Sequence, residues 1–147
     1  MKNLIIIIIL SLLSCQNNAQ TKTEAKPEIK AISISIFGGR STIQSRTYVI
    51  TKDSVLYDLV THHRAQNIKK SYPNKAQDWE NLLKSIDLEK FKNAKNGSSY
   101  QETDGYDTEI TITTTKEKII KLNGEKSESW SKAYRQLISI YFKEEKK

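Results

Sequence analysis

Apolar and polar residues alternate along the first half of the chain with a period of two. Residues 32–36 read Ile-Ser-Ile-Ser-Ile, a pattern typical of a strand with one buried face. Gly38-Gly39 interrupts this run, and residues 42–50 predict a second strand in which Tyr48 and Ile50 share a face. After a polar turn at residues 51–54, a third strand follows, with Val55, Tyr57 and Leu59 on one side, and ends near His62-His63.

The pattern then changes to a helical period. Trp79, Leu82, Leu83 and Ile86 occur at i, i+3, i+4 and i+7, which places them on one stripe of a helix. Asn74 and Gln77 have the spacing of a capping box, so we expect the helix to begin there. Residues 87–91 predict a short extra turn that directs Leu88 and Phe91 toward the core.

A second hairpin and a final helix complete the pattern. Residues 106–112 alternate between apolar and polar side chains, and residues 119–122 form the expected partner strand, which Asn123-Gly124 ends. We expect the last helix to open at Ser127 or Ser129. Its apolar stripe consists of Trp130, Ala133, Tyr134, Leu137, Ile138 and Tyr141.

These elements predict an α+β domain with the order βββ-α-ββ-α. The expected architecture is a five-stranded, mainly antiparallel sheet with two amphipathic helices packed on one face, since the apolar side of the sheet needs a cover. The expected core anchors lie on the two helices: Trp79, Leu82, Leu83 and Ile86 on the first, and Trp130, Tyr134, Leu137 and Ile138 on the second.

The first fifteen residues do not alternate. Lys2 supplies a positive charge, residues 4–13 form an unbroken apolar run apart from Ser11, and small Ser14 precedes Cys15, the one cysteine of the chain. A positive start, a short apolar run and a small residue at the cleavage position are typical of a secretory signal peptide. The run is too short for a membrane-spanning helix, which needs about twenty residues.

The end of this segment resembles the lipobox of bacterial lipoproteins. Leu12 stands three residues before Cys15 and Ser14 directly before it, as in that motif, although Leu13 occupies a position where a small residue is usual. The resemblance implies cleavage before Cys15, a diacylglyceryl thioether on its sulfur and an acyl chain such as palmitate on its amine. Two or more acyl chains give stable membrane anchoring. Plain secretion is the alternative, and it would leave an orphan thiol.

Known sorting rules of lipoproteins depend on the residues after the cysteine. Gln16 follows Cys15, where an aspartate marks retention in the inner membrane, so the resemblance implies the outer membrane, facing the periplasm. Residues 15–27 contain no large apolar side chain and predict a flexible, lipidated tether. The predicted organisation is therefore a signal peptide at 1–14, a tether at 15–27 and one globular domain at 28–147.

Composition narrows the class of protein. The chain carries 24 Lys and Arg against 17 Asp and Glu, a net charge of +7, and the lysines are interleaved with acidic residues along its length. Nucleic-acid-binding proteins gather their basic residues on one face and add stacking aromatics, so we exclude a nucleic-acid partner. Contact with anionic headgroups stays an alternative to a simply solvated surface. Without Cys15 the domain has no disulfide and no thiolate site.

Several groups of residues suggest chemistry, and each has a simpler structural explanation. His62-His63 alternate in direction on a strand and so do not share a metal there. Glu102, Asp104, Asp107 and Glu109 gather oxygen ligands around Gly105, but the spacing of a calcium loop is absent. The sequence leaves open whether either group binds an ion. We expect no metal site, no cofactor and no catalytic set, since the chain lacks a nucleophile motif such as G-x-S-x-G.

Gly38-Gly39-Arg40-Ser41 has the composition of an anion-binding loop. A phosphate loop precedes a helix, whereas strands flank this one, so a hairpin turn is the expected structure.

Within the domain, two motifs resemble those of small uncharacterised lipoprotein domains that carry two helices on a mixed sheet. These are Trp79-x-x-Leu82-Leu83 and Asp104-Gly105-Tyr106-Asp107. No activity comes with this resemblance. We therefore expect a membrane-anchored, non-catalytic binding module with a protein, peptide or glycan partner in the envelope. An immunity or inhibitor-type protein that neutralises a toxin or hydrolase is the alternative function.

Overall fold

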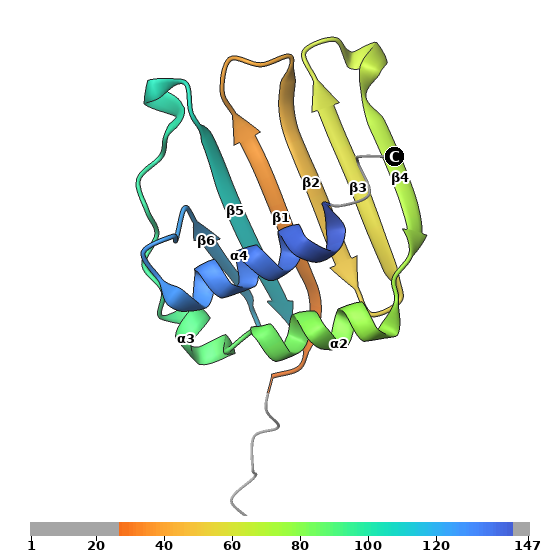
Figure 1. The fold of residues 1–147 in the computed structure, drawn as a ribbon, viewed down its shortest axis with the longest axis vertical. Coiled ribbons are helices and arrows are strands. Elements are labelled where there is room, and N and C mark those ends of the chain that lie inside the picture. Colours follow the sequence, from red (N-terminus) through yellow and green to blue (C-terminus); the bar gives the residue numbers. More distant parts are fainter. Residues whose placement is uncertain (1–26, 143–147) are drawn as a thin grey trace, which may run out of the picture.

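The computed structural model describes residues 27–142, which form an open antiparallel sheet with helices packed against it (Figure 1). The sheet has six strands in the order β4-β3-β2-β1-β5-β6. Their bounds are Ile29–Gly38 for β1, Ile43–Thr51 for β2, Ser54–Thr61 for β3, Ile68–Pro73 for β4, Tyr106–Thr114 for β5 and Lys118–Leu122 for β6. The α+β class and the antiparallel pairing predicted from the sequence are confirmed.

Cross-strand register builds the core from the alternation seen in the sequence. Ile34 of β1 pairs with Tyr48 of β2 on one side and with Ile110 of β5 on the other. Two residues earlier on β1, Ile32 pairs in the same way with Ile50 of β2 and Ile112 of β5. All six of these side chains are buried, because successive strand residues point to opposite faces and this set points to the helices.

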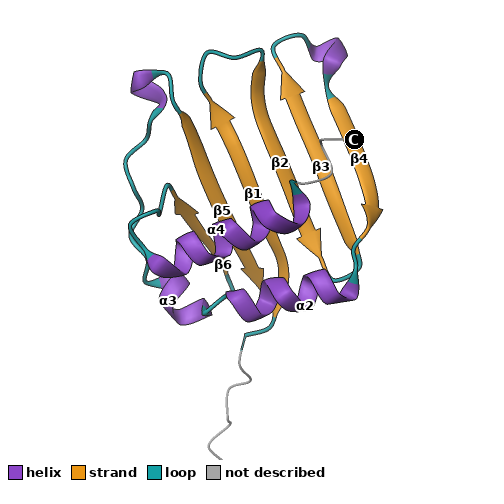
Figure 2. Ribbon diagram, viewed as in Figure 1, coloured by secondary structure: helices purple, strands orange, loops and turns teal. Residues whose placement is uncertain are grey.

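Two helices cover that face, and Figure 2 shows them as α2 and α4 beside the strands. Helix α2 spans Ala76–Ser85 and α4 spans Glu128–Tyr141. Trp79, Leu82, Trp130 and Leu137 belong to the buried core, and the other four expected anchors are partly buried against it: Leu83, Ile86, Tyr134 and Ile138.

A third helix, α3, spans Leu88–Lys92, where the sequence predicted a short turn. The Asp87 side chain caps it by accepting a hydrogen bond of 3.1 Å from the backbone N–H of Lys90, and Phe91 is fully buried. The Nζ of Lys92 lies 2.6 Å from Oε1 of Glu117, which ties α3 to the turn between β5 and β6. The described residues therefore form three α-helices, where the sequence predicted two.

The prediction of five strands was wrong because it missed β4. Of its residues only Ile68 and Tyr72 are large and apolar, and most of the strand is exposed. It is an edge strand held by backbone pairing with β3, so its sequence does not alternate. Two short 3₁₀ turns, η1 at Arg64–Gln66 and η2 at Gln101–Thr103, precede β4 and β5.

The predicted capping box of α2 was also wrong. Lys75 is the N-cap residue, and no side chain caps the helix. The Asn74 side chain instead donates 2.6 Å to the carbonyl of Thr51 and accepts 3.2 Å from the Tyr141 hydroxyl. The Asn74 side chain, which the local pattern predicted as the cap of α2, therefore forms its hydrogen bonds with β2 and α4.

No helix within residues 27–142 is long and apolar enough to cross a bilayer. Residues 1–26, which include the predicted signal peptide, Cys15 and most of the predicted tether, lie outside the described residues.

Candidate functional site

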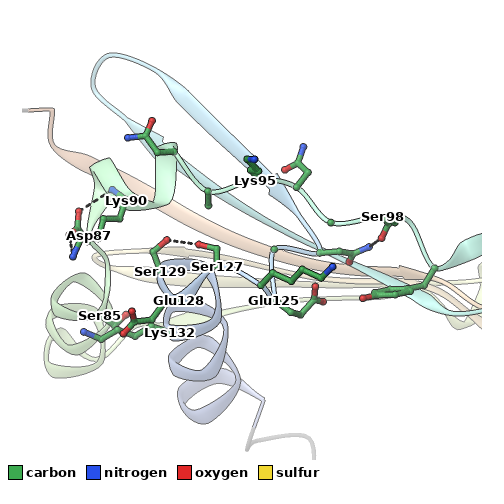
Figure 3. Close-up of a pocket in the computed structure, with 18 residues that line it drawn as sticks. Ser85, Asp87, Lys90, Lys95, Ser98, Glu125, Ser127, Glu128, Ser129 and Lys132 are labelled. Atoms are coloured by element: carbon green, nitrogen blue, oxygen red, sulfur yellow. Dashed lines mark hydrogen bonds and ion pairs between the residues drawn. The ribbon is translucent and has the colours of Figure 1, made fainter.

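A cleft of about 1030 Å³ opens at the edge of the sheet beside β6. Its walls come from three segments that are far apart in the chain: α3, the loop of residues 93–100, and the turn at residues 123–127 with the first turn of α4 (Figure 3). Lysine, serine, asparagine and glutamate side chains dominate the lining.

The loop wall is fastened to the end of β6. The Asn96 side-chain oxygen accepts 3.0 Å from the N–H of Leu122, and the N–H of Gly97 donates 2.8 Å to the carbonyl of the same residue. Gly97 passes so close to the Asn123 carbonyl that a Cβ there would collide with it. The loop therefore extends the pairing of the sheet beyond its last strand and has a fixed position.

Asn123 joins this loop to β5 from the turn after β6. Its backbone is left-handed, with φ at +45°, and its side-chain oxygen accepts 2.7 Å from the N–H of Thr108. Its amide nitrogen donates 2.8 Å to the carbonyl of Ser98 and 2.7 Å to Oδ1 of Asp107. Asparagine tolerates this backbone conformation better than most residues, and here its side chain satisfies three buried groups.

Asp107 is 1 % exposed and anchors the network behind the cleft. Besides Asn123, it accepts hydrogen bonds from the Ser99 hydroxyl at 2.7 Å, the Tyr100 N–H at 2.8 Å and the Gln101 side chain at 2.8 Å. Burial by itself raises the pKa of Asp107, but these hydrogen bonds to the carboxylate outweigh it and lower the pKa to about 2. The carboxylate is therefore charged at neutral pH, and its hydrogen bonds hold the loop of residues 99–101 in place.

The helix wall presents the first turn of α4. Ser127 is the N-cap residue, as expected, but its hydroxyl bonds the Ser129 hydroxyl at 2.9 Å and caps no backbone N–H. The two serines face each other in the middle of Figure 3. The Trp130 ring packs against Gly124, where a Cβ would lie 2.6 Å from the ring, and its Nε1 donates 3.4 Å to the carbonyl of Lys121. Trp130 therefore fixes this wall on its buried side, and Ser127 and Ser129 make its open side polar.

The charges of the cleft are only partly neutralised. Asp87 and Lys90 form an ion pair of 3.4 Å at the base of α3, and the hydrogen bond from the Lys90 backbone holds the pKa of the Asp87 carboxyl below its usual value. Within residues 27–142 no ion pair reaches the other three lysines of the lining, Lys95, Lys126 and Lys132. Glu125 and Glu128 lie on the same wall as the last two.

This arrangement suits the binding of a polar ligand. Lysine ammonium groups donate up to three hydrogen bonds each, glutamates accept them, and serine and asparagine do both. A ligand that carries hydroxyl, amide and carboxylate groups would find partners for all three in the cleft. The aromatic ring of Tyr100 also lines it and is 46 % exposed.

The histidine pair singled out in the sequence lies on the surface of the domain. His62 and His63 follow the end of β3 and are exposed, and Nδ1 of His62 shares a hydrogen bond of 3.0 Å with the Gln44 side chain. Residues 27–142 contain no group of three His, Cys, Asp or Glu side chains placed to hold a metal ion.

The acidic set is divided among separate roles. Asp107 is buried in the network above, Asp104 pairs with Arg40 at 2.7 Å, and Glu109 accepts 3.2 Å from the Thr111 hydroxyl. Glu102 lies in η2 and is exposed. Asp104 has a left-handed backbone with φ at +59°, a conformation typical of a tight turn.

Gly38-Gly39-Arg40-Ser41 forms the turn between β1 and β2, as expected. Gly38 and Gly39 have φ of +96° and +73°, values that favour glycine. The Tyr106 ring lies against Gly39, so the turn packs on the start of β5.

Sequence reasoning missed the cleft. Lys95, Lys126 and Lys132 are spread over almost forty residues, and only the return of the chain beside β6 brings them together. The Asn123-Gly124 pair was recognised as the end of a strand, and that signal marked one wall of the cleft. The lipidation prediction at Cys15 lies outside the described residues.

No protein-family model matches this chain, and a search of curated proteins found no similar sequence.

Proposed function

We propose that this protein is a bacterial envelope lipoprotein, held by lipid on Cys15 to the outer membrane and facing the periplasm. Its domain binds a component of the envelope without changing it chemically. The tether of residues 15–27 spaces the domain from the bilayer and leads to β1.

The cleft beside β6 is the observation that carries the binding role. It is large enough for a ligand of several rings or residues, and pockets of this volume are typical of ligand sites. The buried Asp107 carboxylate and the Asn123 side chain fix the loop wall from behind, so the site is formed before a ligand arrives. A preformed site loses little conformational entropy on binding.

Three of the four serine hydroxyls that line the cleft favour binding over catalysis. Ser127 and Ser129 bond each other, and the Ser85 hydroxyl donates 2.6 Å to the carbonyl of Leu82. A serine nucleophile needs a general base within hydrogen-bond reach. The partners of these three hydroxyls are another hydroxyl or a backbone carbonyl, which do not serve that purpose.

The lining indicates a ligand with carboxylate and hydroxyl groups. Lys95, Lys126 and Lys132 supply positive charge and form no ion pair within the described residues, and the cleft offers amides and hydroxyls beside them. Peptidoglycan fragments, in which sugars carry acidic peptides, have this chemistry and occur in the compartment we propose.

The anchor is tested by the intact mass of the protein extracted from membranes of a bacterium that expresses the full chain. We expect a polypeptide that begins at Cys15 and carries the added mass of a diacylglyceryl group and an acyl chain. A Cys15→Ser variant should keep the unprocessed leader and lack the lipid. An unlipidated mature chain would contradict the anchor and leave the binding role untouched.

The cleft is tested by titrating the full chain in detergent with soluble peptidoglycan fragments, and measuring affinity by calorimetry. Lys132→Glu, inside the cleft, should weaken binding at least tenfold. Lys84→Glu on α2 is the matched control, because that lysine does not line the cleft. Equal affinity of both variants, or conversion of the fragments to new products, would contradict the proposal.

A further inference from the structure

The face of the sheet opposite α2 and α4 carries no charged side chain at its centre. Strands β1 and β2 occupy the middle of the sheet. Their side chains on this face alternate with the buried set, and they are all small or apolar: Ala31, Ser33, Ser35, Phe37, Ser45, Thr47, Val49 and Thr51. Since 28 % of the chain is charged, about two of eight such positions would be charged by composition alone.

Charges return on the flanking strands of this face. On one side, Nζ of Lys69 on β4 lies 3.2 Å from Oδ2 of Asp58 on β3. On the other side, the register places Glu109 of β5 and Lys118 of β6 on the same face. Apolar side chains are exposed there too: Leu56 of β3 is 48 % exposed and Ile120 of β6 is 47 % exposed.

A centre depleted of charged side chains and surrounded by charged ones is a feature of protein–protein interfaces. The small side chains of these strands also make the centre flat, since seven of the eight are no larger than valine. The flat surface fits a partner that is itself flat.

The edges of the sheet are protected against strand addition, which leaves the face as the surface for a partner. At one edge, β4 carries Lys69 and Lys70 and ends at Pro73, residues that discourage pairing with another strand. At the other edge, Asn96 and Gly97 already occupy the N–H and carbonyl of Leu122 at the end of β6.

We propose that this face binds the same face of a second copy of the chain, so that two sheets stack into a sandwich. Six strands spaced about 4.8 Å apart and some seven residues long give a face of roughly 600 Å² before the relief of the side chains is counted. Two such faces would together bury about 1,200 Å², which is the lower end of the range for specific interfaces. Stacked sheets lie about 10 Å apart. In a two-fold symmetric dimer, the same face of each copy contacts the other.

This inference is independent of the ligand proposed for the cleft, which lies at the β6 edge and stays open in the pair. The test is sedimentation of the full chain in a detergent matched in density to the solvent, over a range of micromolar concentrations. We expect the wild-type chain to sediment with twice the mass of one polypeptide.

Ser33→Lys places a charge at the centre of the face, and we expect it to weaken pairing at least a hundredfold and give a single chain. Ser139→Lys is the matched control, because Ser139 is exposed on α4, and it should leave the pair intact. Far-ultraviolet circular dichroism checks that each variant is folded. If Ser33→Lys is not folded, Leu56→Lys replaces it, since that side chain is already half exposed.

A wild-type chain that stays single at all concentrations overturns the proposal. So does a pair that survives the lysine substitution on the face, since it must then form through another surface.

Discussion

The two faces of the sheet use the same six strands and differ in what lies over them. On the covered face, the strands present Ile32, Ile34, Ile110 and Ile112, all fully buried beneath the helices. On the open face, the same strands present serine and threonine at Ser33, Ser35 and Thr113, which are partly exposed. Hydrophobic burial holds the covered face together, whereas the open face contributes mainly backbone pairing.

This difference implies that the covered face determines the stability of the domain, whereas the open face is available for recognition. A substitution on the covered face removes packed volume and affects folding. A substitution on the open face, or in the cleft beside β6, changes a surface that meets water or a partner, and affects folding little. The following predictions test that separation, beginning with the largest expected effect.

Trp130→Ala on the covered face should lower the free energy of unfolding by about 3–5 kcal/mol. Trp130 is 1 % exposed, and its ring stacks on Tyr134 with centroids 5.2 Å apart and packs against Gly124. Urea denaturation followed by circular dichroism measures the loss. A change below about 1 kcal/mol would show that the tryptophan is not a core anchor.

Asp107 is a buried charge on β5, and Asp107→Asn should lower the free energy of unfolding by about 1.5–3 kcal/mol, the usual contribution of hydrogen bonds to a charged group. Its folded pKa of about 2 lies below the unfolded value of 3.8, so the carboxylate contributes stability above pH 4 and loses it as the pH falls toward 2. This shift corresponds to about 2 kcal/mol.

Unfolding free energies measured between pH 2 and pH 6 check the contribution of Asp107. The wild-type chain should lose stability over the lower part of this range, and the asparagine variant should lose less. Parallel curves for the two proteins would contradict the assignment.

Tyr141→Phe on α4 should cost about 1 kcal/mol by removing the hydrogen bond to Asn74. Burial raises the pKa of Tyr141, and Asp78 and Tyr72 raise it further, so that it reaches about 12 although Asn74 lowers it. The folded pKa lies above the unfolded value of 10, so this contribution is complete below pH 10 and is lost between pH 10 and 12. Ultraviolet absorbance of tyrosinate, compared between the two proteins, measures the titration.

Leu56→Ser on the open face should change the free energy of unfolding by less than about 0.5 kcal/mol. The measurement is made at submicromolar concentration, where pairing between copies does not contribute. A loss comparable to that of Trp130→Ala would show that the open face is part of the core.

Local pattern determined the elements that have one buried side. The alternation at residues 32–36 and 106–112 and the stripes that begin at Trp79 and Trp130 correspond to β1, β5, α2 and α4. When one face of a helix or strand is buried, apolar residues recur in the sequence with the period of that element. This period can be recognised without knowing which elements pack against the face. The signal-peptide pattern before Cys15 is likewise a property of the sequence alone, and it stays a prediction.

Only the tertiary structure decided the remaining features, because they depend on contacts between distant residues. Strand β4 forms by pairing with β3 and buries little, so its sequence shows no period. Asn74 binds Thr51 and Tyr141 in place of capping α2. The cleft and the charge-free centre of the open face depend on the spatial order of the strands, β4-β3-β2-β1-β5-β6. This order cannot be read from the order of the strands along the chain.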